Sequence, residues 1–323
     1  MNIFVTGGNG FIGKKIVERL SVQGHNIRML SRHAGLNNPG NTLENVQVVK
    51  GDLTAENYSL EQHLVDCDVI IHCAGEIRNT SLMRSLHVDG TNRLIKSALT
   101  ESKKIKRIIH WVQLSSVGTY GPPTGAANSN RMISEYTTPH PVGEYEITKM
   151  QSDELVMKAA ETGLITYTII RPSNVFSADM PNQSLRSLVK LIDKKLFFYI
   201  GKPGAIATYI HADDVVELLL RCIDDERAIG EIFNISNDCV LEDLINGISR
   251  VLNKEETKLR IPESIIRAVV AVVGRIVKLP LTKERINALV LRTKYPYTKL
   301  EKKLDFVPTI SVQESIGEIV SRT

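Results

Sequence analysis

A tyrosine and a lysine stand four residues apart in the segment Tyr145-Glu146-Ile147-Thr148-Lys149. On a helix, side chains with this spacing share one face. A free tyrosine has a pKa of about 10, and a nearby ammonium group lowers that pKa by stabilising the phenolate. Tyr145 could then give a proton to a carbonyl oxygen as hydride reaches the carbon, or take the proton in reverse. The pair predicts acid–base chemistry on a carbonyl, with Tyr145 as proton donor and Lys149 as the group that tunes it.

A hydroxyl group precedes this pair at the end of a predicted strand. Ser116 closes the apolar run that begins at Arg107, and open α/β sheets bind ligands at the carboxyl ends of their strands. Ser116 is therefore the candidate to hydrogen-bond the substrate carbonyl and stabilise the oxyanion. A Y-x-x-x-K pair alone arises readily by chance, so the position of Ser116 strengthens the assignment. Ser116, Tyr145 and Lys149 are the predicted catalytic residues.

A glycine-rich turn follows the first predicted strand and opens the first predicted helix. It reads Thr6-Gly7-Gly8-Asn9-Gly10-Phe11-Ile12-Gly13. Gly7 would supply the tight turn, Gly10 would let the backbone approach a pyrophosphate, and Gly13 would let the helix pack close to the strand. Free N–H groups and the helix dipole favour an anion at this helix end. The turn predicts a dinucleotide site that includes Gly7, Gly10, Phe11, Ile12 and Gly13.

The residues after the second predicted strand distinguish the two nicotinamide cofactors. An acidic residue there would bond to the ribose hydroxyls of NAD, but this chain has Ser31 followed by Arg32. An arginine can pair with the 2′-phosphate of NADP. We therefore predict that Ser31 and Arg32 bind NADP(H), with NAD(H) as the less favoured cofactor.

A parallel sheet must bring these residues to one edge. Short β-branched runs alternate with helical patterns over the first two-thirds of the chain. This alternation predicts an α/β fold, a Rossmann-like doubly wound parallel sheet with helices on both faces. Strands are expected at 2–6, 26–30, 46–49, 68–72, 107–114 and 165–170, and helices at 11–23, 82–99 and 144–161.

The chain leaves the predicted sheet after Pro172. We expect a dinucleotide-binding domain over residues 1–172, to which 205–236 return with a helix at 212–222 and a strand at 231–235. Residues 173–204 and 237–323 are expected to form a smaller, interleaved and mostly helical substrate domain. The apolar run 265–277 contains Arg267 and Gly274 and is shorter than the ~18 residues of a spanning helix. It predicts a buried or half-buried helix, with a membrane-surface helix as the alternative.

Composition narrows the class of protein. With 42% hydrophobic and 24% charged residues and a net charge of +4, the chain is typical of a soluble globular protein. No basic stripe interleaved with aromatic residues indicates a nucleic-acid partner. The four cysteines lie far apart, which favours free thiols and no metal site. The first residues show no secretory signal, so we predict a cytoplasmic protein.

Further motifs resemble those of the extended short-chain dehydrogenases/reductases, the NAD-dependent epimerase/dehydratase family, in its nucleotide-sugar branch. Besides the glycine turn, S-S-x-x-x-Y-G and Y-x-x-x-K, they are Gly51-Asp52-Leu53, His72-Cys73-Ala74-Gly75, Val88-Asp89-Gly90-Thr91, Arg171-Pro172-Ser173-Asn174-Val175, Tyr209–Val215 and Gly230–Ile235. The resemblance implies that Asp52 and Leu53 lie at the adenine and that Ala74 and Gly75 pass under the cofactor. It also implies that Pro172 and Asn174 lie near the nicotinamide and the substrate.

The chain departs from the family pattern at three places. His87 stands where relatives often carry asparagine, and either a polar role or a plain core position is open. His211 is expected to be a structural hydrogen-bonding residue rather than a catalyst. Many nucleotide-sugar members place an arginine shortly before that histidine, where this chain has Ala205-Ile206-Ala207-Thr208. Arg292 is the candidate to replace it as a substrate ligand.

Three reactions are common in the family. Dehydratases carry an Asp-Glu pair where this chain has Val117-Gly118, and epimerases usually show the acidic ribose ligand. We therefore predict NADPH-dependent reduction of a keto group, with a 4-keto nucleotide sugar (a cell-surface polysaccharide precursor) as substrate. The alternatives are a nucleotide-sugar 4-epimerase with bound NAD(P), a reductase of a small or apolar ketone or aldehyde, and a non-catalytic NADP-sensing module. The resemblance also implies a homodimer formed through helices that include 144–161.

Overall fold

A seven-stranded parallel sheet forms the centre of the computed structural model, which describes residues 1–33, 43–56, 58–123, 129–181, 183–273 and 281–321. Its strand order is β12-β7-β5-β4-β1-β2-β3. The bounds are β1 Asn2–Thr6, β2 Asn26–Ser31, β3 Val46–Lys50, β4 Val69–His72, β5 Ile109–Leu114, β7 Ile165–Pro172 and β12 Glu231–Ile235. The predicted strands are confirmed, each to within two residues at either end.

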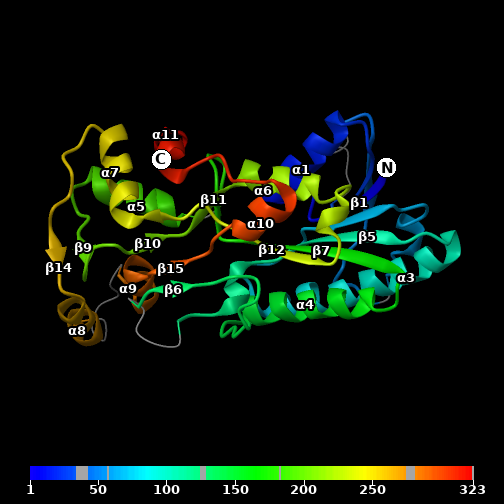
Figure 1. Ribbon diagram of the computed structural model, residues 1–323, viewed down its shortest axis with the longest axis horizontal. Helices are drawn as coiled ribbons and strands as arrows, with labels where there is room; N and C mark the ends of the chain where they lie inside the picture. Colours follow the sequence, from blue (N-terminus) through cyan, green and yellow to red (C-terminus); the bar gives the residue numbers. More distant parts are fainter. Residues whose placement is uncertain (34–42, 57, 124–128, 182, 274–280, 322–323) are drawn as a thin grey trace.

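Helices cover both faces of this sheet, as Figure 1 shows. On one face lie α1 (Phe11–Val22) and α6 (Ala212–Arg221), which pack against each other. On the other lie α3 (Thr91–Ile105) and α4 (Glu144–Ala160). Each layer has its own buried apolar cluster, the first around Leu20, Leu219 and Phe233 and the second around Leu94, Trp111 and Val156. The doubly wound fold is therefore confirmed.

The segment predicted as one helix over 82–99 differs from the expectation. It consists of α2 (Thr80–Arg84), a π-helical turn (Ser85–Gly90) and then α3. Gly90 closes the turn against Leu53, since a Cβ on Gly90 would lie 3.1 Å from the Leu53 Cβ. π-Helical turns are rare, so the sequence pattern did not indicate one.

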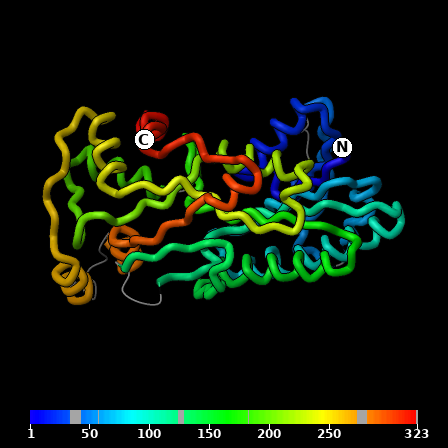
Figure 2. Tube along the Cα trace, in the orientation of Figure 1, coloured from blue at the N-terminus to red at the C-terminus, as the bar shows by residue number. Residues whose placement is uncertain are grey.

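The second part of the molecule lies at the other end of the long axis, with the C-terminus beside it (Figure 2). Helices α5 (Ser184–Asp193), α7 (Leu241–Val251) and α11 (Val312–Val320) share an apolar cluster there. Four two-stranded sheets join β8 to β11, β9 to β14, β10 to β13 and β6 to β15, with bounds β6 Arg131–Met132, β8 Asn174–Phe176, β9 Tyr199–Ile200, β10 Ile206–Ala207, β11 Tyr209–His211, β13 Cys239–Val240, β14 Arg260–Ile261 and β15 Thr293–Lys294.

Three further helices complete the described chain, namely α8 (Glu263–Val273), α9 (Lys283–Val290) and α10 (Thr298–Leu304). Helix α8 covers most of the apolar run predicted to be helical, and residues 274–277 of that run lie outside the described residues. Ile266 of α8 packs into a small cluster with Ile286 and Val290 of α9. Ile265, Val269 and Val272 of the same helix are exposed, so the prediction of a buried or half-buried helix holds for one face only. Within the described ranges, no helix is long and apolar enough to cross a membrane.

Candidate active site

The glycine turn between β1 and α1 forms a cradle that side chains would fill. Gly7 has φ +72°, and a Cβ there would lie 2.6 Å from the Ala74 nitrogen. A Cβ on Gly13 would lie 2.1 Å from the Gly7 carbonyl oxygen. Gly10 precedes α1 and has no side chain to cap it, so the first N–H groups of the helix are not capped by that residue. This cradle at a helix N-terminus fits the pyrophosphate of a dinucleotide.

Phe11 and Ile12 begin α1 immediately after the cradle. Phe11 packs against the apolar cluster of α5, α7 and α11, whereas Ile12 packs against the cluster between the sheet and helices α1 and α6. The turn is therefore anchored on both parts of the molecule.

The residues predicted to bind the adenosine part of the cofactor lie at the carboxyl ends of β2 and β3. Because Ser31 is paired with Lys50 in the β2–β3 register, Arg32 and Asp52 follow neighbouring strand ends. Ser31 is buried, and its hydroxyl accepts a hydrogen bond from Asn9 Nδ2 at 2.9 Å, whereas Arg32 is exposed. Asp52 accepts hydrogen bonds from the nitrogen and the hydroxyl of Thr54, both at 2.8 Å.

The three predicted catalytic residues come together at the carboxyl end of β5. Ser116 follows that strand, and its Oγ accepts the Gly118 N–H at 3.0 Å. The same hydroxyl hydrogen-bonds to Tyr145 in the first turn of α4. Lys149 is buried one turn later and donates from Nζ to the Leu114 carbonyl at 2.5 Å. Strand β5 and helix α4 therefore bring the serine, tyrosine and lysine to one place.

The electrostatics of the tyrosine differ from the sequence expectation. Burial raises the pKa of Tyr145 to about 12, Glu146 adds to the increase, and the hydrogen bond from Ser116 opposes it. Burial lowers the pKa of Lys149, and the nearby Asp153 carboxylate partly restores it. Tyr145 is thus protonated at neutral pH, which suits a proton donor.

The sequence analysis did not predict the buried ion pair between Asp153 and Arg171 that lies next to Lys149. Asp153 lies one helical turn after Lys149, and its Oδ2 accepts from Arg171 Nη2 at 3.0 Å and from Ser115 Oγ at 2.7 Å. Arg171 also donates from Nη1 to the Tyr120 hydroxyl at 3.1 Å. The arginine of the R-P-x-N-V motif therefore supports the lysine helix. The four-residue spacing from Lys149 to Asp153 was the available signal.

The two residues predicted to bind the substrate, Asn174 and Arg292, form hydrogen bonds with residues in 202–208 instead of with the predicted catalytic residues. Asn174 Nδ2 donates to the Thr208 carbonyl at 2.9 Å. Arg292 Nη2 donates to the carbonyls of Lys202, at 3.3 Å, and Pro203. Asn174 is exposed and Arg292 is half-buried.

Two residues of the family motifs, Pro172 and His211, lie at the ends of secondary-structure elements. Pro172 ends β7 beside Ile235 of β12. His211 caps α6 by accepting the Asp213 N–H at Nδ1, at 3.2 Å, which agrees with the structural role expected for it.

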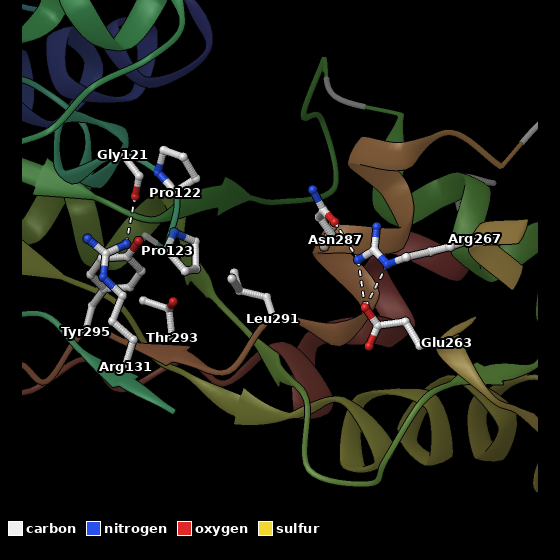
Figure 3. Close-up of a pocket in the computed structure, with 11 residues that line it drawn as sticks. Gly121, Pro122, Pro123, Arg131, Glu263, Arg267, Asn287, Leu291, Thr293 and Tyr295 are labelled. Atoms are coloured by element: carbon white, nitrogen blue, oxygen red, sulfur yellow. Dashed lines mark hydrogen bonds and ion pairs between the residues drawn. The ribbon is translucent and has the colours of Figure 1, made fainter. Parts of the chain in front are cut away.

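A cavity of about 600 Å³ lies between the loop that follows Ser116 and the α8–α9 region (Figure 3). At one end Arg131 Nη1 donates to the Gly121 carbonyl at 2.8 Å, and at the other Arg267 bonds to Glu263 and Asn287, each at 2.8 Å. The lining between them is largely apolar and consists of Pro122, Pro123, Ala288, Leu291, Thr293 and Tyr295. Both parts of the chain therefore line one cavity, and Ser116, Tyr145 and Lys149 are not among its lining residues. The described residues hold no group of three side chains suited to a metal ion.

The fold and the site together define an NAD(P)-dependent enzyme of the oxidoreductase type. Known protein families identify the class more closely. Residues 3–236 match the NAD dependent epimerase/dehydratase family, and the chain belongs to it. The resemblance to the extended short-chain dehydrogenases/reductases is thereby confirmed.

Relatives in this family act on several kinds of substrate. The chain is 23% identical to a UDP-glucose 4-epimerase of Vibrio cholerae, over 81% of this chain and 79% of the relative. It is 25% identical to a farnesyl-dihydroquinoline-oxide ketoreductase of Stigmatella aurantiaca, over 75% and 70%. It is 30% identical to a dTDP-6-deoxy-L-talose 4-dehydrogenase (NAD(P)(+)) of Kitasatospora kifunensis, over 57% and 55%.

Solved structures share the fold over the whole chain. The UDP-glucose 4-epimerase of Thermotoga maritima, with UDP-glucose, gives a TM-score of 0.73 at 19% identity and covers 100% of this chain and 98% of its own. The UDP-glucuronic acid 4-epimerase of Bacillus cereus, with NAD, gives 0.74 at 17% identity, with 100% and 96% covered. At these identities the likeness establishes the fold alone.

Proposed function

We propose that this protein uses NADPH to reduce the keto group of a 4-keto nucleotide sugar, a cell-surface polysaccharide precursor. The observation that carries this is the place of Tyr145, half-buried and hydrogen-bonded to Ser116 at the carboxyl end of the sheet. Among the residues that follow Ser116, Val117 and Gly118 carry no acid or base for dehydration. The residues at the site thus suit proton donation to a carbonyl oxygen.

The cofactor would lie along the strand ends. Gly7, Gly10, Phe11, Ile12 and Gly13 would hold the pyrophosphate, because the cradle they form fits close backbone approach. When bound, the nicotinamide supplies hydride to the carbonyl carbon. The remaining predicted contacts of the cofactor are Ser31 and Arg32 at the 2′-phosphate, Asp52 and Leu53 at the adenine, and Ala74, Gly75, Pro172, Tyr145 and Lys149 at the nicotinamide side.

The chain's own residues perform the acid–base step. Ser116 would donate a hydrogen bond to the carbonyl oxygen of the substrate and steady the charge that develops there. Tyr145 would transfer its Oη proton to that oxygen, and the buried Lys149 ammonium would stabilise the phenolate left behind. Asn174 and Arg292 are the proposed substrate ligands. Both bonds that Arg292 makes to carbonyls use Nη2, so Nε and Nη1 are available as donors within the described structure.

Two kinds of relative bear on the substrate. The UDP-glucose 4-epimerase and the deoxytalose dehydrogenase act on nucleotide sugars, which supports the sugar assignment. The second candidate is reduction of an apolar ketone. It is favoured by the apolar lining of the cavity at Pro122, Leu291 and Tyr295 and by the farnesylated substrate of the Stigmatella relative. We further propose a cytoplasmic homodimer in which α4 contributes to the interface.

The test is turnover with defined substrates. Purified protein is given NADPH with UDP- or dTDP-4-keto-6-deoxy sugars, and the loss of NADPH absorbance is compared with the sugar product. Stoichiometric NADPH consumption supports the proposal, and a strong preference for farnesylated or sterol ketones supports the second candidate. Interconversion of 4-hydroxy sugars without net cofactor consumption would identify an epimerase. Binding of NADPH without turnover of any of these compounds would identify a sensing module.

A further inference from the structure

His87 is a buried histidine that contacts the proposed proton donor. It lies in the π-helical turn Ser85–Gly90 and is 1% exposed. Its ring meets the Tyr145 ring edge-on, with centroids 5.7 Å apart and planes at 82°. Both ring nitrogens have partners, since Nε2 lies 2.8 Å from the Glu76 nitrogen and Nδ1 lies 2.8 Å from Thr148 Oγ1. π-Helical turns are frequent at functional sites.

The partners of His87 determine its tautomer. The Glu76 N–H can only donate, so Nε2 must accept and the ring proton must be on Nδ1. Nδ1 then donates to Thr148 Oγ1, whose own proton goes to the Glu144 carbonyl at 2.7 Å. Burial and the Lys149 charge lower the pKa of His87 to about 3. The ring is therefore neutral with one defined tautomer at physiological pH.

A second histidine holds the other end of the same segment. The Ala74 N–H donates to Thr6 Oγ1 at 3.3 Å, and Thr6 Oγ1 donates to His72 Nδ1 at 2.7 Å. His72 Nε2 then donates to Thr91 Oγ1 at 2.9 Å, and Thr91 donates to the His87 carbonyl at 2.6 Å. The backbone from Ala74 to Glu76 is thus anchored at both ends by one connected hydrogen-bond chain.

Between these anchors lies the predicted floor of the cofactor site. His87 Nε2 accepts the N–H of Glu76, the residue that follows Gly75, and a Cβ built on Gly75 would lie 3.5 Å from the same nitrogen, so the imidazole lies next to the residue expected to pass under the cofactor. One ring therefore touches both the floor and the Tyr145 side chain. Movement of that ring would change the distance between the nicotinamide and the proton donor.

We propose that His87 is a positioning residue that holds the Ala74–Glu76 backbone and the Tyr145 ring in a fixed relation. The inference rests on the proposed role of Tyr145 as proton donor. The neutral His87 ring makes three contacts. Nε2 accepts the Glu76 N–H, Nδ1 donates to Thr148, and the ring packs edge-on against Tyr145. A displacement of about 1 Å between reacting groups can cost a factor of about 10² in rate.

Three substitutions separate these contacts. His87→Phe keeps a ring beside Tyr145 and removes both nitrogens. His87→Gln can still present an acceptor to Glu76, whereas His87→Asn can present a donor to Thr148 but is too short to reach Glu76. The matched control is His110→Phe, because His110 is a partly buried histidine near the amino end of β5 that bonds to Thr166 and to the Cys222 carbonyl.

NADPH dissociation constants, kcat and KM are measured for each variant, with circular dichroism to establish that it is folded. We expect His87→Phe to lower kcat about 100-fold and to weaken NADPH about tenfold. His87→Gln should restore NADPH affinity to within about threefold of the parent, and His87→Asn should not. The His110→Phe control should change each constant less than about threefold.

A double variant tests whether His87 acts through the tyrosine. In the Tyr145→Phe background, His87→Phe should lower the residual kcat less than about threefold, because the group it positions is gone. An equal loss in both backgrounds, or a loss no greater than that of His110→Phe, overturns the proposal. If Tyr145→Phe keeps full turnover, the proposed function fails. In that case the NADPH affinities of the Gln and Asn variants still decide whether His87 holds the cofactor floor.

Discussion

The sheet side of the molecule and the opposite side, which carries Arg292, hold their charged groups differently. On the sheet side, Lys149, Asp153 and Arg171 are buried and bonded to groups of the core. On the opposite side, Arg292 is half-buried and bonds to carbonyls of the 202–203 loop. The elements there are short, with strands of two residues such as β15. The predicted catalytic lysine is thus held by the core, whereas the proposed substrate ligand Arg292 lies on a segment that can change without disturbing the sheet.

The largest expected effect is on the sheet side. Tyr145→Phe removes the proton donor and should lower kcat about 10³-fold, within the range for general acid catalysis. The NADPH dissociation constant should change less than twofold, because the phenyl ring keeps its place beside His87. Steady-state turnover with the substrate that the parent protein reduces is the measurement. Full turnover by this variant would contradict the catalytic assignment.

The buried ion pair offers a stability test of the same comparison. Arg171→Met leaves the fully buried Asp153 carboxylate without its guanidinium partner and should lower the free energy of unfolding by about 3–5 kcal/mol. Arg292→Met, on the other side, should lower it by less than about 1 kcal/mol. Urea unfolding of both variants is the check. Equal losses of unfolding free energy in the two variants would mean that Arg171 and Arg292 stabilise the fold to the same extent, which would contradict the comparison.

The cofactor preference depends on an exposed residue at the edge of the sheet side. Arg32→Ala should weaken NADPH by about 10-fold to 100-fold, the contribution of charge-assisted hydrogen bonds to a phosphate, and should leave NADH unchanged. Fluorescence titration with both cofactors measures the ratio of the two dissociation constants. A ratio near one in the parent protein would remove the basis for the preference.

On the substrate side we expect a smaller and different change. Arg292→Met removes a proposed substrate ligand and should raise KM about tenfold, the value of one hydrogen bond of about 1.4 kcal/mol, with kcat nearly unchanged. The NADPH dissociation constant serves as the internal control. A fall in kcat with unchanged KM would instead place Arg292 in the chemical step.

The smallest effect concerns acid stability. Burial lowers the pKa of His72 and of His87 to about 3, below the value of about 6.5 in an unfolded chain. Their contribution to stability is therefore complete above pH 6.5 and is lost as the pH falls from 6.5 toward 3, since only the unfolded chain binds those protons. Unfolding free energies measured across this range should show a shallower decline for His87→Gln than for the parent.

Local patterns predicted the elements that carry the site. The apolar runs of β1, β4 and β5 and the amphipathic pattern of α1 follow from short-range periodicity, and the structure has them close to their expected bounds. The glycine turn could be interpreted in the same way, because the glycine spacing after a strand and before a helix is itself a local pattern. Contacts between distant segments could not be predicted in this way. Arg171 meets Asp153 across 18 residues, and His87 meets Thr148 across 61.

The sequence by itself determined the doubly wound sheet, the dinucleotide cradle and the set Ser116, Tyr145 and Lys149, because each depends on residue types at short and regular spacings. Only the tertiary structure decided the surroundings of that set. Burial raises the Tyr145 pKa to about 12, and the Leu114 carbonyl holds the Lys149 ammonium group. It also decided that a π-helical turn places His87 against the tyrosine. Desolvation and long-range hydrogen bonds depend on the whole packed chain, so no short pattern can express them.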